Sequence, residues 1–418
     1  MSSAKLKLKH RVIRSGDELS RSQRVGYIIL LGLAMGLIPF AIDPVLPSFP
    51  LIGEHYNVDN AVVQWTLTGL SIGLALGQLL VGPLSDSLGR RRPMLFSVGL
   101  FALAEIGCYL APNFETFLVL RVLVGVGASG ASVIGFAVMR DLYAGQSLIN
   151  FMGRVFLIQG LTPVIGPFAG SQLLAIMGWK EVILAFGLFG ILLLAALFLM
   201  LIETLHSEDR RAKGFDGMAG RFKAVLRDRV YVGLLIMSFL QHVGLFTYLN
   251  TFTFITQDSY GLSALEFGLF MTVNSVASWI GVQVGAWGAR KVAAQWALIS
   301  SIGMILLATS ILIISGLTHA PLIFVAVGFC LYMFSFGATI TPLNGLALNK
   351  HGEEAGTAAS LLGTMNFIMP AVATVVYNQL RTDSSLDAGV MMTVLYLAGL
   401  ASIFFISRPK TMARMSQH

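Results

Sequence analysis

Residues 82–92 read Gly-Pro-Leu-Ser-Asp-Ser-Leu-Gly-Arg-Arg-Arg and lie between two long apolar runs. Gly82 permits the close approach of two helices, and Gly89 permits a tight turn. Asp86 can cap a helix or face the N-terminus of a neighbouring helix, whose dipole favours anions. A plain basic loop between two membrane spans would not need glycine, aspartate and glycine at this spacing. The stretch therefore indicates a structured loop between packed helices.

The composition of the chain places this loop in a membrane protein. Of the 418 residues 56% are hydrophobic and only 12% are charged, whereas soluble proteins carry about 25% charged residues. The net charge of +7 lies in short clusters between apolar runs, with no stripe of basic and aromatic residues. Nucleic acid is therefore not an expected partner. Cys108 and Cys330 both lie in apolar runs, and their positions suggest neither a metal site nor a disulfide.

Twelve apolar runs reach the roughly 20 residues that a transmembrane helix needs. Six of them precede the long hydrophilic segment 203–230, which lies near the midpoint of the chain, and six follow it. Six spans, a charged connector and six spans is the layout of a duplicated membrane fold. The predicted spans are 25–48, 63–84, 94–111, 115–138, 147–174, 180–202, 231–255, 267–288, 296–316, 321–343, 357–379 and 389–407.

The basic residues predict which side of the membrane each loop faces. Cytoplasmic loops carry an excess of Lys and Arg, and placing both termini in the cytoplasm leaves only Lys180 and Arg381 in outer loops. An odd number of spans would break this alternation. We therefore predict an all-α, multi-pass protein of the inner cell membrane. Its parts are an uncleaved cytoplasmic tail at 1–24, a six-helix half at 25–202, a cytoplasmic connector at 203–230, a second six-helix half at 231–407 and a cytoplasmic tail at 408–418.

The loop at 82–92 resembles the inner-loop signature of the major facilitator superfamily, usually written G-x-L-a-D-r-x-G-r-[kr]. Ser87 departs from it, since a basic residue is usual there. In that family the aspartate and the first arginine latch the two halves in the outward-facing state. The resemblance implies that Asp86 faces the start of span eleven near Thr357 and that Arg90 meets Asp141. The latch residues it implies are Gly82, Asp86, Gly89, Arg90, Arg91 and Asp141.

Span four contains Gly125, Gly127 and Gly130, which fit the dinucleotide-binding pattern G-x-G-x-x-G. That pattern requires a preceding strand and a βαβ unit, whereas here it lies inside an apolar helix, so we reject the nucleotide interpretation. Small residues on a transmembrane helix instead permit close packing. With Arg121, the stretch resembles the family's R-x-x-x-G-x-G-a motif, in which the arginine is tied to proton transfer.

Span five resembles the family's antiporter motif, which ends G-P-x-x-G-G and marks exporters rather than importers. Ser171 replaces its last glycine. The physical content of the motif is a helix that bends and packs tightly, because proline interrupts the hydrogen-bond ladder. A simple packing kink is the alternative interpretation. The residues that carry the motif are Gly160, Gly166, Pro167 and Gly170.

Three further stretches point to one branch of the superfamily. Residues 41–47 read AIDPVLP, 139–143 read MRDLY, and 356–360 read GTAAS. Together they resemble the bicyclomycin and chloramphenicol resistance (Bcr/CflA) branch, whose members are twelve-helix drug:proton antiporters.

Four ionisable residues fall within the predicted spans, where charges are costly and usually functional. Asp43, Glu105 and Arg121 lie at similar depth toward the outer side, whereas Arg154 lies near the inner end of span five and is expected to snorkel to the headgroups. We expect Asp43 to take either a proton or a cationic substrate, with Arg121 modulating it. A static Asp43–Arg121 pair is the structural alternative, and Glu105 has the alternative of only bonding a neighbouring helix.

Polar residues in several spans are candidates for a substrate pocket, although each is also typical of contacts between transmembrane helices. His242 titrates near neutrality when unperturbed, but a lone histidine does not establish a relay. The candidates are Gln159, Gln241, Tyr248, Asn250, Asn274 and Asn366.

The sequence predicts a proton-coupled exporter of small lipophilic or cationic drugs, of the chloramphenicol type, that works by alternating access. We identify no P-loop, catalytic constellation or metal-ligand cluster, so we expect no enzyme activity, no metal and no cofactor, with the proton gradient as energy source. The expected partners are a small-molecule substrate, protons and the lipid bilayer, and the protein is expected to act as a monomer. An exporter of a specific metabolite, such as a sugar or amino-acid derivative, and a non-transporting membrane sensor are the alternatives.

Overall fold

A computed structural model describes residues 15–143, 145–206, 208, 220, 223, 225–348, 358, 361–368 and 384–409. The elements that these residues form are all helices. This agrees with the all-α architecture that the apolar runs predict.

The first predicted span is broken into short helices. α2 (Arg21–Met35) begins at a capping box in which the Ser20 side chain accepts from the backbone of Gln23, and it ends at Gly36. α3 (Leu37–Ile42) follows directly. Pro44 and Pro47 lack the N–H groups that would continue the ladder, so the chain passes through the short helix η3 (Leu46–Ser48). The two helices that follow are α4 (Phe49–Tyr56) and α5 (Asn60–Val63).

The remaining helices of the first half match the predicted spans two to six. They are α6 (Trp65–Leu88), α7 (Arg91–Leu110), α8 (Phe114–Leu142), α9 (Gly145–Ile176) and α10 (Trp179–Met200). Their bounds agree with the predicted ones to within four residues at each end, and α8 and α9 extend beyond the predicted spans at both ends.

The second half repeats this pattern, with three π-helical segments extending its helices. Residues 361–368, inside the predicted span 357–379, are also helical. The helices with bounds are α12 (Arg229–Phe254), η4 (Ile255–Ser259), α13 (Ala264–Gly288), η5 (Ala289–Ala293), α14 (Ala294–Leu317), α15 (Leu322–Leu348), α17 (Ser385–Ala401) and η6 (Ser402–Ser407).

In the described part of the chain, 10 helices are long and apolar enough to cross a membrane. One of them, 264–317, covers both predicted spans 267–288 and 296–316, which meet at η5. Most of the predicted span 357–379, most of the connector and the outer parts of both tails lie outside the described residues. The count of twelve and the cytoplasmic position of both termini therefore stay predictions.

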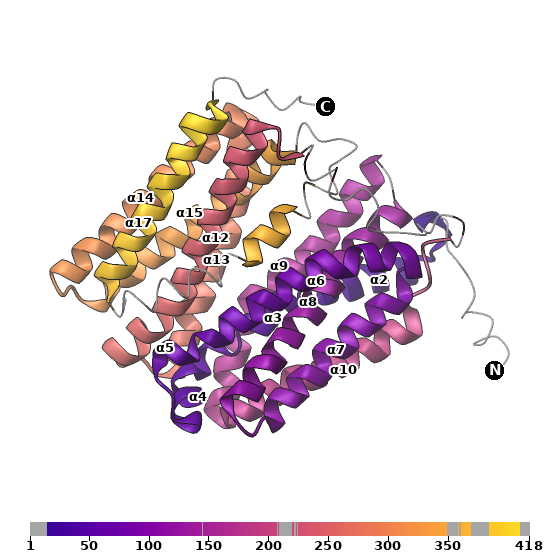
Figure 1. Ribbon diagram of the computed structural model, residues 1–418, viewed down its shortest axis with the longest axis horizontal. Helices are drawn as coiled ribbons and strands as arrows, with labels where there is room; N and C mark the ends of the chain where they lie inside the picture. Colours follow the sequence, from indigo (N-terminus) through magenta and orange to yellow (C-terminus); the bar gives the residue numbers. More distant parts are fainter. Residues whose placement is uncertain are drawn as a thin grey trace. The chain divides into compact units, whose positions relative to one another are not determined.

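Contacts divide the chain into two compact units. The first comprises Met1–Val45, Gly69–Gly166 and Ile176–Asp216, and the second comprises Leu46–Thr68, Pro167–Ala175 and Gly217–His418. Within the first, α7 packs against α8 and α10, and α2 packs against α8 (Figure 1). Within the second, α14 packs against α15 and α17, and α12 packs against α15. Equivalent helices of the two halves thus meet in the same pairs, as a duplicated fold requires.

Glycines set the closest helix crossings in both halves. A β-carbon on Gly73 of α6 would clash with the Val122 carbonyl of α8 and lie 3.0 Å from the Cα of Gly125. In the second half, a β-carbon on Gly285 of α13 would lie 2.9 Å from the Cα of Ala338 on α15. Gly125 therefore serves helix packing, and its helical setting confirms that the stretch is no nucleotide-binding turn.

Replacing Gly73 by leucine should prevent the α6–α8 crossing from closing. Overpacking of a tight interface costs about 1–3 kcal/mol, and here the clash is with backbone, which cannot swing away. The midpoint of thermal unfolding of the purified protein should fall by several degrees. Gly303→Leu on α14 is the matched control, because a β-carbon there meets nothing within 4 Å. An equal fall for both variants would contradict this account of the crossing.

Candidate functional site

A buried ion pair joins α7 to α8. Arg121 Nη1 lies 3.2 Å from Glu105 Oε1, and the two side chains are 0% and 1% exposed. Arg121 Nη2 also donates to the carbonyl of Ala41 in α3. One guanidinium thus ties three helices of the first unit together, and the carboxylate of Glu105 compensates its charge.

The pair has unused hydrogen-bonding capacity. Glu105 Oε2 and Arg121 Nε are buried and have no hydrogen-bond partner among the described residues. Buried polar atoms are seldom left unsatisfied, and each such atom needs an explanation. Here the free acceptor and the free donor lie on the only two charged side chains that are at most 1% exposed in the described part of the chain. A proton, a water molecule or a ligand can complete this network.

Asp43 lies beside this network but does not pair with Arg121. Its backbone N–H donates to the carbonyl of Pro39 at 2.8 Å, which continues the turn of α3. The side chain is buried, at 9% exposure, and no ion pair or hydrogen bond to its carboxylate is found within the described ranges. The static Asp43–Arg121 pair, which was the structural alternative, is not found among the described residues, where Glu105 is the ion-pair partner of Arg121.

The antiporter motif faces Asp43. A β-carbon on Gly166 of α9 would lie 3.3 Å from the Asp43 Cβ and 3.6 Å from the Pro44 Cδ. Glycine at this position lets the backbone of α9 approach the carboxyl-bearing turn closely. One end of the motif therefore forms a wall of the Asp43 site.

The other end of the motif packs on α13 within the second unit. A β-carbon on Gly268 would clash with the Ser171 side chain and lie 3.0 Å from the Pro167 carbonyl. Ser171 is the residue that replaces the last glycine of the motif, and Gly268 supplies the space that its hydroxymethyl group needs. Of the remaining motif residues, Gly160 is half-buried and Gly170 is buried.

The inner loop is built around Arg90. Gly89 has φ of 89°, a left-handed conformation that favours glycine. Arg90 then reaches Asp141 with an Nε–Oδ2 distance of 2.9 Å and Asp86 with an Nη1–Oδ1 distance of 2.6 Å. The predicted Arg90–Asp141 contact is present. Thr357, the predicted neighbour of Asp86, lies outside the described residues.

Opposing influences act on the Arg90 guanidinium, which lies between two membrane-spanning helices. Burial lowers its pKa, but the hydrogen bonds and charges of Asp141 and Asp86 outweigh burial, so the pKa lies above its ordinary value. Arg90 therefore stays charged, and Asp86 and Asp141 compensate that charge.

Glu203 completes the inner loop and was missed by sequence reasoning. Its carboxylate accepts from the backbone N–H of Arg90 at 2.7 Å and from that of Arg91 at 3.3 Å. No side chain of its own turn caps α7 at Arg90, and an acidic group is favourable at a helix N-terminus. The sequence signal for Glu203 was an acidic residue directly after span six. We assigned that residue to the connector 203–230 and gave it no role in the inner loop.

Arg91 and Thr204 reinforce the same junction. Arg91 donates to the carbonyls of Leu201 at 2.7 Å and Phe198 at 2.8 Å, and Thr204 Oγ1 donates to Asp141 Oδ2 at 2.9 Å. Arginines in this loop thus hold the end of α10 as well as the end of α8. Gly82 is less constrained, since a β-carbon there would meet only Val133, at 3.4 Å.

Two of the predicted pocket residues meet in the second unit. Asn274 Nδ2 of α13 donates to the Tyr248 hydroxyl of α12 at 2.9 Å, and that hydroxyl lies 3.1 Å from the Met271 sulfur. The Tyr248 ring packs against Phe252 and Tyr332, with centroid distances of 5.2 and 5.9 Å. This pair is buried in an aromatic cluster.

The other predicted pocket residues make separate contacts. Asn250 Nδ2 donates to the Phe246 carbonyl of its own helix at 2.9 Å, and Asn366 accepts from Ser238 at 2.8 Å. Gln241 is buried, whereas Gln159 is half-buried and belongs to the first unit. The side-chain oxygens of Gln241, Asn250 and Asn274 have no hydrogen-bond partner within the described residues, so each can still accept a bond from a ligand or water.

The sequence profile of the Major Facilitator Superfamily matches residues 29–374. The chain belongs to this superfamily. It is a transporter. It is also a multi-pass protein of the inner membrane, as the apolar runs predict.

Known superfamily members agree with both the sequence and the fold. The chain is 30% identical to an uncharacterized MFS-type transporter, YdgK, of Bacillus subtilis, over 93% of this chain and 97% of that protein. It is 25% identical to a bicyclomycin resistance protein homolog of Haemophilus influenzae, over 91% of this chain and 96% of that protein. The crystal structure of a D-xylose-proton symporter superposes with a TM-score of 0.76 at 16% identity, covering 94% of this chain and 99% of that one. The relatives confirm the resemblance to the Bcr/CflA branch, and the symporter confirms the fold.

Proposed function

We propose that this transporter exports small lipophilic or cationic drugs in exchange for protons, by alternating access between two six-helix halves. The observation that carries the proposal is Asp43, a buried carboxyl group that no described cation neutralises. The backbone at Gly166 of the antiporter motif lies directly against it. The bicyclomycin resistance homolog in Haemophilus influenzae supports an antibiotic as substrate.

The chemistry of exchange follows from the cost of a buried charge. An ionised carboxylate in an apolar site is unfavourable unless a counter-charge compensates it. A proton or the cationic group of a substrate can each do so at Asp43, but not both together. Protonation from outside would then release the drug, and loss of that proton to the cytoplasm would restore the affinity for drug. No covalent chemistry and no cofactor are needed.

Neutral substrates of the chloramphenicol type require a different link to the same proton. Such a molecule can accept or donate hydrogen bonds, and these change when the carboxyl group gains a proton. The Glu105–Arg121 pair is joined to α3 at the carbonyl of Ala41, which lies two residues before Asp43 in the chain. It is therefore suited to orient the turn that carries Asp43, which is the role that we assign to Arg121.

The experiment that tests the proposal measures drug accumulation in everted membrane vesicles. An imposed gradient, acidic inside, should drive accumulation of chloramphenicol and of a lipophilic cation, and a protonophore should abolish it. Accumulation of a single sugar or amino-acid derivative, with none of the drugs, would overturn the drug proposal in favour of a metabolite exporter. Binding without accumulation of any compound would favour a sensor.

Arg90→Ala should stop transport without abolishing drug binding. Its removal leaves Asp86 and Asp141 without the guanidinium that joins them, so we expect the inner loop to lose its hold on the ends of α6 and α8. Accumulation in vesicles should fall close to background, while equilibrium drug binding in detergent changes little. Arg92→Ala is the control, because Arg92 is exposed. Normal transport by the Arg90 variant would rule out a latch in this loop.

A further inference from the structure

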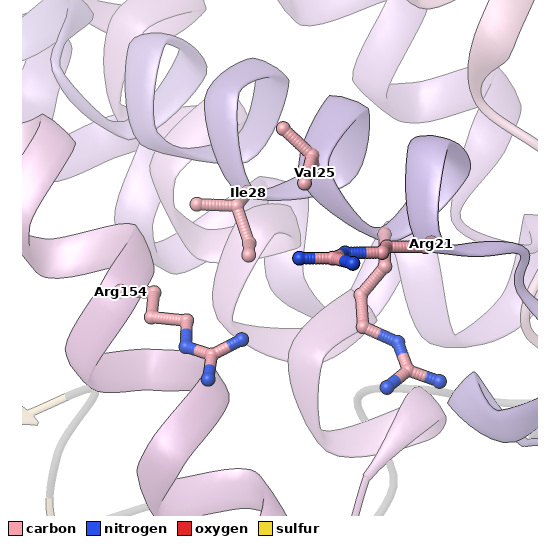
Figure 2. A pocket seen from close by; sticks show the side chains of 5 residues that line it. Arg21, Val25, Ile28 and Arg154 are labelled. Carbon is pink, nitrogen blue, oxygen red and sulfur yellow. The ribbon is translucent and has the colours of Figure 1, made fainter.

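A cavity with a strongly basic lining opens at the beginning of α2, away from Asp43. Its volume is about 510 Å³, and its lining consists of Arg21, Arg24, Val25, Ile28 and Arg154. The first four lie on one face of α2, at the three- and four-residue spacing that aligns side chains along a helix. Arg154 extends toward them from α9 (Figure 2). Two helices of the first unit thus present three guanidinium groups to one cavity.

The charges of this cavity are not balanced by its own lining. None of the described residues that line it is acidic. Arg21 and Arg154 are exposed, whereas Arg24 is half-buried and donates to the Gly16 carbonyl at 3.3 Å. The like charges of Arg21 and Arg154 repel each other across this space unless an anion lies between them. Guanidinium groups bind phosphate by paired hydrogen bonds, which makes a phosphate group the best-matched occupant.

The apolar part of the lining indicates where that phosphate comes from. Val25 is 50% exposed, and on the same two helices Ile29 and Leu157 are 44% and 57% exposed. Ile29 lies one helical turn from Val25, and Leu157 lies one turn from Arg154. Apolar surface therefore adjoins the lining on both helices, which suits acyl chains rather than water. The basic residues predict that this end of α2 faces the cytoplasm, where anionic lipids attract arginine and lysine. A soluble phosphate ion would gain nothing from contact with these apolar side chains.

We propose that this cavity binds the phosphate of an anionic phospholipid headgroup. Arg21 and Arg154 would bind the phosphate, and Arg24, which donates to the Gly16 carbonyl, would line the cavity beneath it. The lipid would bridge α2 and α9, the helix that carries the antiporter motif. This site is independent of drug and proton exchange at Asp43. Its test therefore requires neither a substrate nor a pH gradient.

The test is native mass spectrometry of the purified full-length protein titrated with phosphatidylglycerol. We expect one lipid to bind the wild type more tightly than phosphatidylcholine of the same acyl chains. Each arginine near an anionic surface contributes about fivefold in affinity, so R21Q/R154Q should weaken phosphatidylglycerol binding about 25-fold. R21K/R154K keeps both charges but loses the paired hydrogen bonds of the guanidinium groups, so its affinity should lie between those of the wild type and R21Q/R154Q.

The matched control removes the same charge elsewhere. R290Q/K291Q neutralises two basic residues of η5, which the sequence also assigns to the cytoplasmic side, and it should leave binding unchanged. Equal losses in R21Q/R154Q and R290Q/K291Q would overturn the proposal, because they would indicate general attraction to basic surface. Unchanged binding in R21Q/R154Q would overturn it as well. Displacement of the lipid by inorganic phosphate at equal concentration would overturn the assignment to a lipid.

Discussion

Arg121→Met is expected to destabilise the protein by about 3–5 kcal/mol, the cost of leaving the partner of a buried ion pair without its counter-charge. Glu105 is 1% exposed, and Arg121 is its ion-pair partner in the described structure. The variant also removes the bond to the Ala41 carbonyl, which ties α8 to α3. Thermal unfolding of the purified protein measures the loss.

The double variant Glu105→Gln with Arg121→Met separates the ion pair from simple packing. It removes both charges, so it should be more stable than Arg121→Met alone. Lowering the pH should recover part of the stability of Arg121→Met, because a protonated Glu105 has no charge to leave unpaired. Arg92→Met is the control for loss of an arginine at an exposed position and should change stability little. Equal destabilisation by the single and double variants would contradict the account.

Asp43→Asn should abolish proton-driven drug accumulation and leave the fold at least as stable as the wild type. The substitution replaces a buried carboxyl group that lacks a cationic partner among the described residues, so no stabilising pair is broken. Accumulation in everted vesicles should fall to that of vesicles without the transporter. Asp59→Asn is the matched control, since Asp59 is an exposed carboxylate in the same half.

The same variant should change how drug affinity depends on pH. In the wild type a proton competes with a cationic drug, so affinity should fall with falling pH, by up to about tenfold per unit for one displaced proton. In Asp43→Asn the affinity for the cationic drug should no longer fall as the pH falls. A wild-type affinity that is independent of pH would remove Asp43 from the coupling.

The sequence predicted the helices because their signal is local. Apolar length alone predicted spans near those seen for α6, α7, α8, α9 and α10. The sequence also predicted close packing of α8, because Gly125, Gly127 and Gly130 are small residues on a transmembrane helix. The break in span one was less visible, because its prolines and Asp43 lie inside an apolar run that continues on both sides.

The ion-pair partner of Arg121 could not be predicted from the sequence, for a different reason. Sequence position predicts the depth of a side chain in the membrane, and it placed Asp43, Glu105 and Arg121 at similar depth. It does not give the rotation of each helix about its axis, which decides whether the Arg121 guanidinium pairs with the carboxylate of Asp43 or with that of Glu105. Glu203 was missed because its contacts with Arg90 and Arg91 are made to backbone N–H groups, which no residue pattern displays.

The most direct test of the central claim is proton release when drug binds to purified protein in weak buffer. A lipophilic cation added to the wild type should release up to one proton per molecule bound, and Asp43→Asn should bind the same compound without releasing any. Release that persists in Asp43→Asn would assign the proton to another group, such as Glu105. Binding to the wild type with no proton release at any pH would contradict proton-coupled export altogether.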